Sequence, residues 1–276
     1  MKFIIDNYSH SNTTQPMCFH RGFIDEGHES YILDMTQVSV YDVMDVHNPD
    51  VVLSSASRLS RALLSYLIND KSKKLILNID NVPKTDLEQM ISYITQNDVS
   101  LLFLLSSDYS LPSKIGKVNV VKILPCVDTY MVQKLDFDYN IDIGYIIDNM
   151  QDEIGFPTTF HVISTNPDLI NKVDISMNCL GLRSIYDRYN TIVLNDMKSI
   201  NQVFFDGLAY GKQLYYTGNY EQEKINNILK LDVDLRYDSD QKTTDFSEIK
   251  KVIMEKHTGQ NRTRQLLSQI NGNFKV

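Results

Sequence analysis

The segment KSKKLILNIDNVPKTDLEQMISYITQN (71–97) joins a short apolar run to a helix-like stretch, and it decides the fold class. The run from Leu75 to Ile79 predicts a strand that is buried on both faces. After Pro83, Thr85 and Glu88 have the spacing of a capping box, which predicts a helix over 85–97. A buried strand followed directly by a helix is typical of a parallel α/β sheet.

The same alternation of apolar runs and helical spacing repeats along the whole chain. It predicts an α/β protein of two doubly wound, Rossmann-like domains, 1–132 and 133–276, with a cleft between them. The boundary is placed at the polar stretch QKLDFDYN (133–140), and the last helix could pack back on the first domain. We expect strands at 2–6, 29–34, 49–55, 75–80, 99–107, 118–125, 141–148, 160–165, 190–195 and 212–217, and helices at 16–27, 58–69, 85–97, 199–211, 219–230, 245–256 and 261–270.

Composition excludes several classes of protein. The 276 residues carry a net charge of −8, which counts against a protein that holds a DNA duplex mainly through its phosphates. No apolar run approaches the roughly 20 residues that a membrane-spanning helix needs. The three cysteines are widely spaced, which predicts reduced thiols and a cytoplasmic location. Neither they nor the six histidines form a recognisable ligand set, so no metal site is predicted.

Asp80 ends the strand of the opening segment, and two roles are open to it. It either caps the turn before Pro83 or faces the edge of the sheet where ligands bind. Polar residues expected near the same edge follow the first and third strands. The polar residues of the loop NYSHSNTTQ (7–15) either offer hydrogen-bond donors to a polar ligand or form only a polar turn. Arg58 and Arg61, which follow the third strand, face either a cleft or solvent. These acceptor-side candidates are His10, Ser11, Asn12, Thr13, Arg58 and Arg61, together with Pro83 beyond Asp80.

A second acid, Asp206, lies on an expected helix in the stretch FFDGLAYGKQLYYT (204–217). Small residues at 207, 209 and 211 allow this helix to approach a sheet closely. A carboxylate there can accept two hydrogen bonds from adjacent ribose hydroxyl groups. The alternative is a helical aspartate that only faces solvent.

The stretch around Asp206 resembles the nucleotide-sugar-binding signature of GT-B type glycosyltransferases, in which an acid and a small-Leu-Ala-x-Gly run precede a strand. The segments GHESYILD, NPDVVLSS and VVKILPCVDTYM agree with that family in order and place, and KHTGQNRTRQLLSQI is similar to the last helix of its CgeB-like branch. The resemblance implies a GT-B architecture and a nucleotide-sugar donor, UDP-linked, bound near Asp206 and Gly211. Mg²⁺ or Mn²⁺ could assist, although no motif here indicates either.

A narrower resemblance concerns KSKKLILNIDNVP, which is similar to a stretch of T-even phage DNA β-glucosyltransferases. It implies that Asp80 is the general base of an inverting transfer to a 5-hydroxymethylated pyrimidine in double-stranded phage DNA, in the host cytoplasm. The arginines that hold the diphosphate in those enzymes are missing, and the nearest cations in sequence are Lys198, Arg183 and Arg188. The sugar, hexose or pentose, therefore stays open. Three alternatives to transfer onto DNA also stay open. The acceptor is a cell-surface polymer or a small molecule, or the chain is an inactive module that binds a nucleotide or sugar, or it is a plain scaffold subunit.

Overall fold

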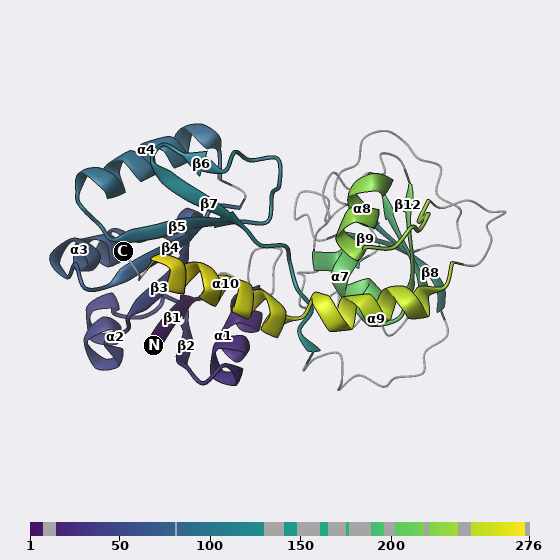
Figure 1. The fold of residues 1–276 in the computed structure, drawn as a ribbon, viewed down its shortest axis with the longest axis horizontal. Helices are drawn as coiled ribbons and strands as arrows, with labels where there is room; N and C mark the ends of the chain where they lie inside the picture. Colours follow the sequence, from purple (N-terminus) through teal and green to yellow (C-terminus); the bar gives the residue numbers. More distant parts are fainter. Residues whose placement is uncertain are drawn as a thin grey trace. The chain divides into compact units, whose positions relative to one another are not determined.

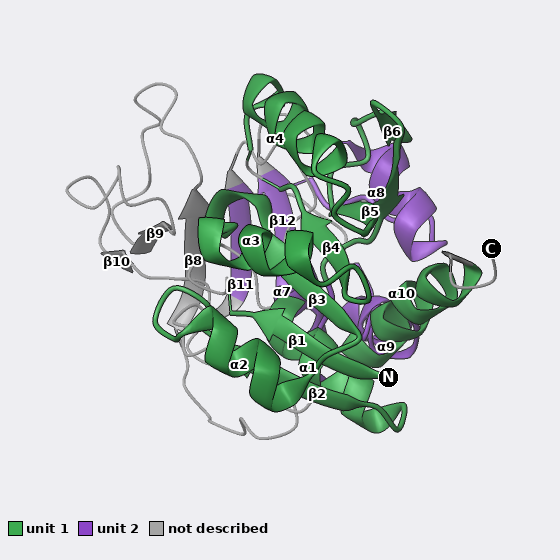
Figure 2. Cartoon of the chain, turned by 90° about the vertical axis from the view of Figure 1, so that its left-hand side faces the viewer, with its two compact units in different colours: residues 1–10, 15–125, 259–276 green, residues 11–14, 126–258 purple. Residues whose placement is uncertain are grey.

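The computed structural model describes residues 1–7, 15–80, 82–129, 141–147, 161–164, 175–176, 189–195, 202–217, 221–236 and 244–273. The chain divides into two compact units (Figure 2): unit 1 comprises residues 1–10, 15–125 and 259–276, and unit 2 comprises residues 11–14 and 126–258. Each unit contains a parallel or mostly parallel sheet with helices, which confirms the predicted fold class. The predicted boundary between 132 and 133 lies outside the described residues, and the cleft stays a prediction.

Unit 1 is built on a seven-stranded sheet with the order β2-β1-β3-β4-β5-β7-β6. Every neighbouring pair is parallel except the short β6–β7 hairpin, which turns at Gly116 with φ +59°. Chain direction therefore brings the carboxyl ends of β1 to β5 and β7 to one edge. The strands are β1 (Lys2–Asp6), β2 (Glu29–Leu33), β3 (Val51–Ser55), β4 (Lys74–Asn78), β5 (Leu101–Ser106), β6 (Lys114–Ile115) and β7 (Val118–Lys122).

Helices cover both faces of this sheet, which explains why its strands read as continuous apolar runs. In β1, Ile4 belongs to one core cluster, whereas Phe3 and Ile5 belong to the other. The Ile4 face is covered by α2 (Val40–His47), α3 (Arg61–Asn69) and α4 (Lys84–Gln96), and the Phe3 face by α1 (Gln15–Asp25) and α10 (Gly259–Asn273), as Figure 1 shows. A short 3₁₀ helix, η1 (Ala56–Arg58), follows β3.

The last helix, α10, belongs to unit 1, where it packs against α1 at very short range. A Cβ atom placed on Gly22 of α1 would lie 2.0 Å from Oγ1 of Thr263 in α10. One on Gly259 would lie 3.1 Å from Cβ of Cys18. Leu266 and Ile270 of α10 are fully buried in the core of this face. The first and last helices of the chain thus complete one layer together.

The predicted capping box at the start of α4 is wrong. The helix begins at Lys84, its N-cap position is Pro83 with φ −57° and ψ 140°, and no side chain caps it. The hydroxyl of Thr85 instead donates to Oδ1 of Asp86 at 3.3 Å. Because proline fixes φ near the helical value and the chain turns helical directly after it, Thr85 already lies within the first turn.

Unit 2 contains a five-stranded sheet with the order β10-β9-β8-β11-β12, parallel throughout. Three described helices belong to it: α7 (Gln202–Ala209), α8 (Gln222–Leu229) and α9 (Phe246–Lys256). Two segments far apart in sequence meet where the chain enters and leaves the unit, because the backbone N–H of Val127 donates to the carbonyl of His257 at 2.9 Å. The strands are β8 (Ile141–Ile147), β9 (His161–Ser164), β10 (Ile175–Ser176), β11 (Tyr189–Asn195) and β12 (Gln213–Thr217).

Candidate functional site

The carboxyl edge of the unit 1 sheet gathers polar side chains at the ends of otherwise apolar strands. Parallel register places Ser55 of β3 beside Asn78 of β4, and Ser106 of β5 beside Lys122 of β7. In sheets of this kind, ligands bind outside the carboxyl ends of the strands, where the strand order reverses. In unit 1 the order reverses between β1 and β3. The buried polar residues of this edge are Asp6, Ser54, Ser55, Asn78 and Ser106.

Asp80, two residues beyond β4, is bound to the end of the neighbouring strand β5. Its Oδ1 accepts hydrogen bonds from the hydroxyl of Ser106 at 2.7 Å and from the backbone N–H of Ser107 at 2.9 Å. Its Oδ2 accepts from the hydroxyl of Ser107 at 3.0 Å, with a longer contact of 3.4 Å from Nδ2 of Asn78. Among the contacts described for this carboxylate, none reaches the turn at Pro83. Its partners therefore place Asp80 at the sheet edge.

Lys122 adds a cation to the same end of the edge. Its Nζ donates to the backbone carbonyl of Asp108 at 2.6 Å. Partial burial lowers the pKa of Lys122 below its ordinary value of 10.5, and this outweighs the carboxylates of Asp108 and Asp80, which raise it. The ammonium group therefore lies close enough to the Asp80 carboxylate to interact with it, in a partly buried position.

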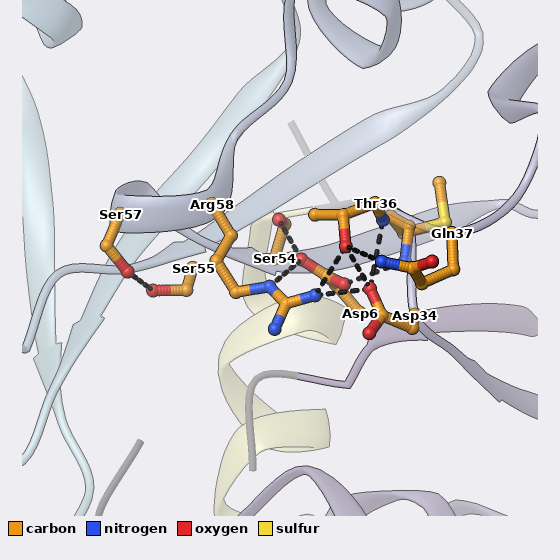
Figure 3. Close-up of polar contacts among 9 residues, drawn as sticks. Asp6, Asp34, Thr36, Gln37, Ser54, Ser55, Ser57 and Arg58 are labelled. Atoms are coloured by element: carbon orange, nitrogen blue, oxygen red, sulfur yellow. Dashed lines mark hydrogen bonds and ion pairs between the residues drawn. The ribbon is translucent and has the colours of Figure 1, made fainter. Parts of the chain in front are cut away.

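A second cluster occupies the point where the strand order reverses (Figure 3). Asp6 ends β1, is fully buried, and accepts from the hydroxyl of Ser54 and the backbone N–H of Met35, each at 3.1 Å. Arg58 of η1 lies beside it, with Nε 3.7 Å from Oδ2 of Asp6. Its Nη2 donates to Oδ1 of Asp34, which follows β2. The guanidinium group thus joins three consecutive strand ends of the sheet.

The electrostatics of this cluster centre on Asp6. Burial raises the pKa of Asp6 above its ordinary value of 3.8, and this outweighs the Met35 N–H, the Arg58 cation and the Ser54 hydroxyl, each of which lowers it. The nearby carboxylate of Asp34 raises the pKa further. Because Asp6 has no exposed surface, it acts on its surroundings by orienting Arg58.

The other predicted acceptor-side residues are placed differently. Arg61 is the first residue of α3 and Pro83 is the N-cap residue of α4, and both are exposed. Residues His10, Ser11, Asn12 and Thr13 lie outside the described part of the chain. The structure therefore brings Arg58 and Asp80 to one edge of unit 1, each within its own polar cluster.

On the donor side, the predicted residue Asp206 lies within the described part of unit 2. It lies on α7, which connects β11 to the neighbouring strand β12, and only 2% of its surface is exposed. Gly211 ends the turn after α7 with φ +72°, a backbone conformation that residues other than glycine rarely adopt. The predicted cations Lys198, Arg183 and Arg188 lie outside the described residues.

Sequence reasoning missed several polar residues of unit 1, although a signal for them was present. Asp6 ends the run KFIID as visibly as Asp80 ends LILNID, and Ser106 and Ser107 end VSLLFLLSS. An acid or a hydroxyl pair at the carboxyl end of a buried strand was the signal. Asp34 and Lys122 could be assigned to the site only after the strand order was known.

Two further properties bear on the kind of site. Within the described residues, no group of three or more His, Cys, Asp or Glu side chains is arranged to hold a metal ion. Nor does any helix in that part of the chain have the length and apolar character needed to cross a membrane.

Comparison with known proteins gives only distant likenesses. No family model and no curated protein matches the sequence. Among solved structures, MnaA of S. aureus with UDP is 10% identical, with a TM-score of 0.43, and the match covers 95% of this chain and 91% of that one. A Listeria monocytogenes protein assigned as a UDP-N-acetylglucosamine 2-epimerase is 10% identical, with a TM-score of 0.42 and coverages of 96% and 90%. CalG4, the calicheamicin glycosyltransferase, is 9% identical, with a TM-score of 0.35 and coverages of 99% and 94%. Likeness at this level does not establish a family or an activity.

Proposed function

We propose that this chain is a glycosyltransferase that moves a sugar from a nucleotide-diphosphate sugar to a hydroxyl acceptor, with Asp80 as the general base. The single observation that carries the proposal is the setting of Asp80. Its carboxylate is held at the carboxyl edge of a doubly wound sheet by Ser106 and Ser107, with no part in capping α4. A carboxylate fixed at such an edge is suited to accept a proton from a bound hydroxyl group.

The reaction step follows from that setting. The acceptor hydroxyl loses its proton to Asp80 while its oxygen attacks the anomeric carbon of the donor sugar. The bond from that carbon to the phosphate oxygen breaks, and the nucleoside diphosphate leaves with the electron pair. Oδ1 of Asp80 accepts the two shortest hydrogen bonds, whereas Oδ2 accepts longer ones from the hydroxyl and the N–H of Ser107 and from Asn78. We therefore assign proton uptake to Oδ2, with the Ser107 hydroxyl turned away. Attack from the face opposite the leaving group inverts the anomeric centre.

Unit 2 is the proposed donor-binding unit. It is doubly wound, and the acid of α7, Asp206, precedes a tight turn at Gly211 and the next parallel strand. We assign the ribose hydroxyl groups to Asp206 on the resemblance of this stretch to the GT-B signature, and because only 2% of Asp206 is exposed, ribose binding requires that its carboxylate be uncovered. A UDP-linked hexose or pentose is the proposed donor class, and the residues that neutralise its diphosphate are sought among Lys198, Arg183 and Arg188.

The sequence alone favours a 5-hydroxymethylated pyrimidine in phage DNA as acceptor, on the resemblance around Asp80. A hydroxyl group of a saccharide, of a surface polymer or of a small molecule would undergo the same step at Asp80. The donor half of the proposal can therefore be tested without knowing the acceptor.

The test measures the thermal stability of the full chain with UDP, other nucleoside diphosphates and their sugars. We expect one nucleotide to raise the melting temperature of the wild type and of the matched control Glu223→Gln, which alters an exposed acid of α8. We expect no such shift with Asp206→Asn, provided that this variant melts cooperatively. Hydrolysis of the bound nucleotide sugar without acceptor then separates an enzyme from an inactive binding module. A wild type that responds to no nucleotide would refute the proposal.

A further inference from the structure

The carboxyl edge of unit 1 carries acids and bases side by side among its described residues. Four carboxyl groups lie at or just beyond the ends of β1, β2, β4 and β5: Asp6, Asp34, Asp80 and Asp108. Arg58 ends η1, Lys122 ends β7, and two further cations, Arg61 and Lys84, are the first residues of α3 and α4. Arg58 is already engaged by Asp6 and Asp34, and Lys122 by the carbonyl of Asp108.

The net charge of the protein disfavours a polyanionic ligand at the edge. Proteins that bind nucleic acids draw most of their affinity from lysine and arginine side chains that neutralise phosphates. Here the two cations nearest the strand ends, Arg58 and Lys122, already bind acceptors of the protein itself, and the net charge of the whole chain is −8. A neutral ligand rich in hydroxyl groups meets no such repulsion, because hydroxyl groups donate to carboxylates and accept from guanidinium groups.

Arg58 and Asp34 present such a pair of complementary groups. Their side chains are 19% and 26% exposed, so solvent reaches both. Nη2 of Arg58 is taken by Asp34 and by Thr36 Oγ1 at 3.3 Å, whereas Nη1 donates to none of the described residues and carries no dashed line in Figure 3. The buried Nε of Arg58 also lacks a hydrogen bond, because 3.7 Å to Asp6 is too long for one.

The guanidinium group is nevertheless held in place, which favours recognition of a defined ligand geometry. Asp6 lies behind it, fully buried and fixed by Ser54 and the N–H of Met35. Asp34 is fixed in turn by the backbone N–H of Thr36 at 3.0 Å. A donor whose orientation is set before binding loses little conformational entropy when a ligand arrives.

The spacing of the strands indicates the size of the ligand. Strands β1 and β4 are two places apart in the sheet, which separates their backbones by about 10 Å at roughly 4.8 Å for each step. Arg58 reaches toward Asp34 after β2 and Asp80 toward Ser106 of β5, so a molecule that contacts both must span at least that length. A ligand of more than one sugar ring fits the requirement.

We propose that the carboxyl edge of unit 1 binds a neutral saccharide, and that Arg58 and Asp34 hold two of its hydroxyl groups. The proposal of a saccharide-binding site does not depend on the glycosyl transfer proposed above. The further statement that this saccharide is the acceptor does rest on that transfer. It means that Asp80 deprotonates a saccharide hydroxyl group and not one of DNA.

The experiment measures binding to the full chain, without donor, by saturation-transfer NMR and calorimetry. The probes are glucose, galactose, N-acetylglucosamine, maltose and lactose, and duplex and single-stranded oligonucleotides containing 5-hydroxymethylcytosine. The variants are Arg58→Lys, which keeps the charge but removes the fork of N–H donors, and Asp34→Asn. The matched controls are Arg264→Lys and Glu26→Gln, which alter another arginine–carboxylate pair of unit 1, with Nε 2.7 Å from Oε1.

We expect at least one saccharide to bind the wild type and both controls, and to bind each of the two site variants about tenfold or more weakly. The oligonucleotides should not bind. If Arg58→Lys lowers the melting temperature of unit 1, Asp34→Asn still decides, because it leaves the contact between Arg58 and Asp6 intact. The proposal is overturned if no saccharide binds, if Asp34→Asn binds as the wild type does, or if only the oligonucleotides bind. Nucleotide binding, measured separately, tests the transferase proposal, so the two can fail independently.

Discussion

At the scale of single residues, the position of a carboxylate on a strand was readable from sequence, but its partners were not. Asp80 visibly ends an apolar run, and this allowed only two roles for it. The choice between them depends on Ser106 and Ser107, which lie 26 and 27 residues further along the chain. Contacts at such separation come from strand order, which a sequence pattern does not contain. For the same reason the cluster around Asp6 was missed, since Ser54 is 48 residues away.

Replacement of the proposed base gives the first prediction. Asp80→Asn keeps an oxygen that accepts from Ser106 and from the N–H of Ser107, so the fold should persist. It removes the proton acceptor, and we expect transfer to fall about 100- to 10,000-fold while donor binding stays unchanged. The measurement is the rate of transfer under saturating donor, with the exposed Glu88→Gln of α4 as the control. Transfer at the wild-type rate by Asp80→Asn would exclude this residue as the base.

Burial of Asp6 gives the second prediction, which concerns stability and pH. Because the pKa of Asp6 is raised in the folded state, the folded chain holds an extra proton between pH 3.8 and its own higher pKa. Stability contributed by Asp6 is therefore greatest at low pH and declines as pH rises through that window. Relative to Asp6→Asn, the wild type should lose about 1.4 kcal/mol for every pH unit that the window spans.

Urea unfolding of both proteins between pH 4 and pH 7 provides the measurement. Other titrating groups are shared by the two proteins, so their effects cancel in the difference. A difference in the free energy of unfolding that is constant with pH, or that grows in favour of the wild type, would contradict the assignment.

At the scale of elements, strands and helices followed from local pattern, whereas their exact starts and the smallest elements did not. The strand of residues 2–6 was predicted at its observed bounds because apolar residues end sharply at Asp6. The helix after Pro83 began one residue before the predicted range, since the backbone of proline outweighed the cap residues. The hairpin strand β6 is only two residues long, which is too short to show any period.

The contact between α1 and α10 gives the third prediction. In Gly22→Ala the new methyl group would lie 2.0 Å from Oγ1 and 2.7 Å from Cβ of Thr263, so one helix must shift. We expect a loss of about 1–3 kcal/mol in the free energy of unfolding, measured by urea denaturation. Gly272→Ala, which lies in the partner helix α10 and has open space around it, should be neutral or slightly stabilising.

A double variant checks the cause of that loss. Thr263→Gly removes the atoms that the new methyl group would meet, at its own cost in helix propensity. Gly22→Ala combined with Thr263→Gly should therefore be more stable than the sum of the two single effects predicts. Strict additivity would mean that the two residues do not interact.

At the scale of the whole molecule, the alternation of elements predicted two α/β units, but not how the chain is shared between them. The last helix was left free to pack on either domain, because an amphipathic pattern does not name its partner. The structure assigns α10 to unit 1, where Leu266 and Ile270 complete the core under β1 and β3. Such assignments depend on three-dimensional contacts between segments that are far apart in sequence.

This organisation gives the fourth prediction. Residues 1–125 alone should lack the part of one sheet face's cover that α10 provides, and fail to melt cooperatively. The same residues joined to 259–276 by a short Gly/Ser linker should fold, because Val127 and Thr258 pair directly at the point where the chain leaves and returns. Calorimetry and the dispersion of amide NMR signals distinguish the two proteins. A cooperatively folded 1–125 fragment would show that α10 is dispensable.

The return of the chain's end to its first unit also constrains how the protein is made. A ribosome releases Phe19 and Phe23 well before Leu266 and Ile270, although all four residues belong to the same core. At 5–20 residues per second, translation of residues 126–273 takes about 7 to 30 s. During that interval the nascent chain exposes an incomplete apolar layer to solvent, so unit 2 has time to fold before unit 1 can close. Synthesis of unit 1 therefore begins before that of unit 2, but unit 1 is completed only after unit 2.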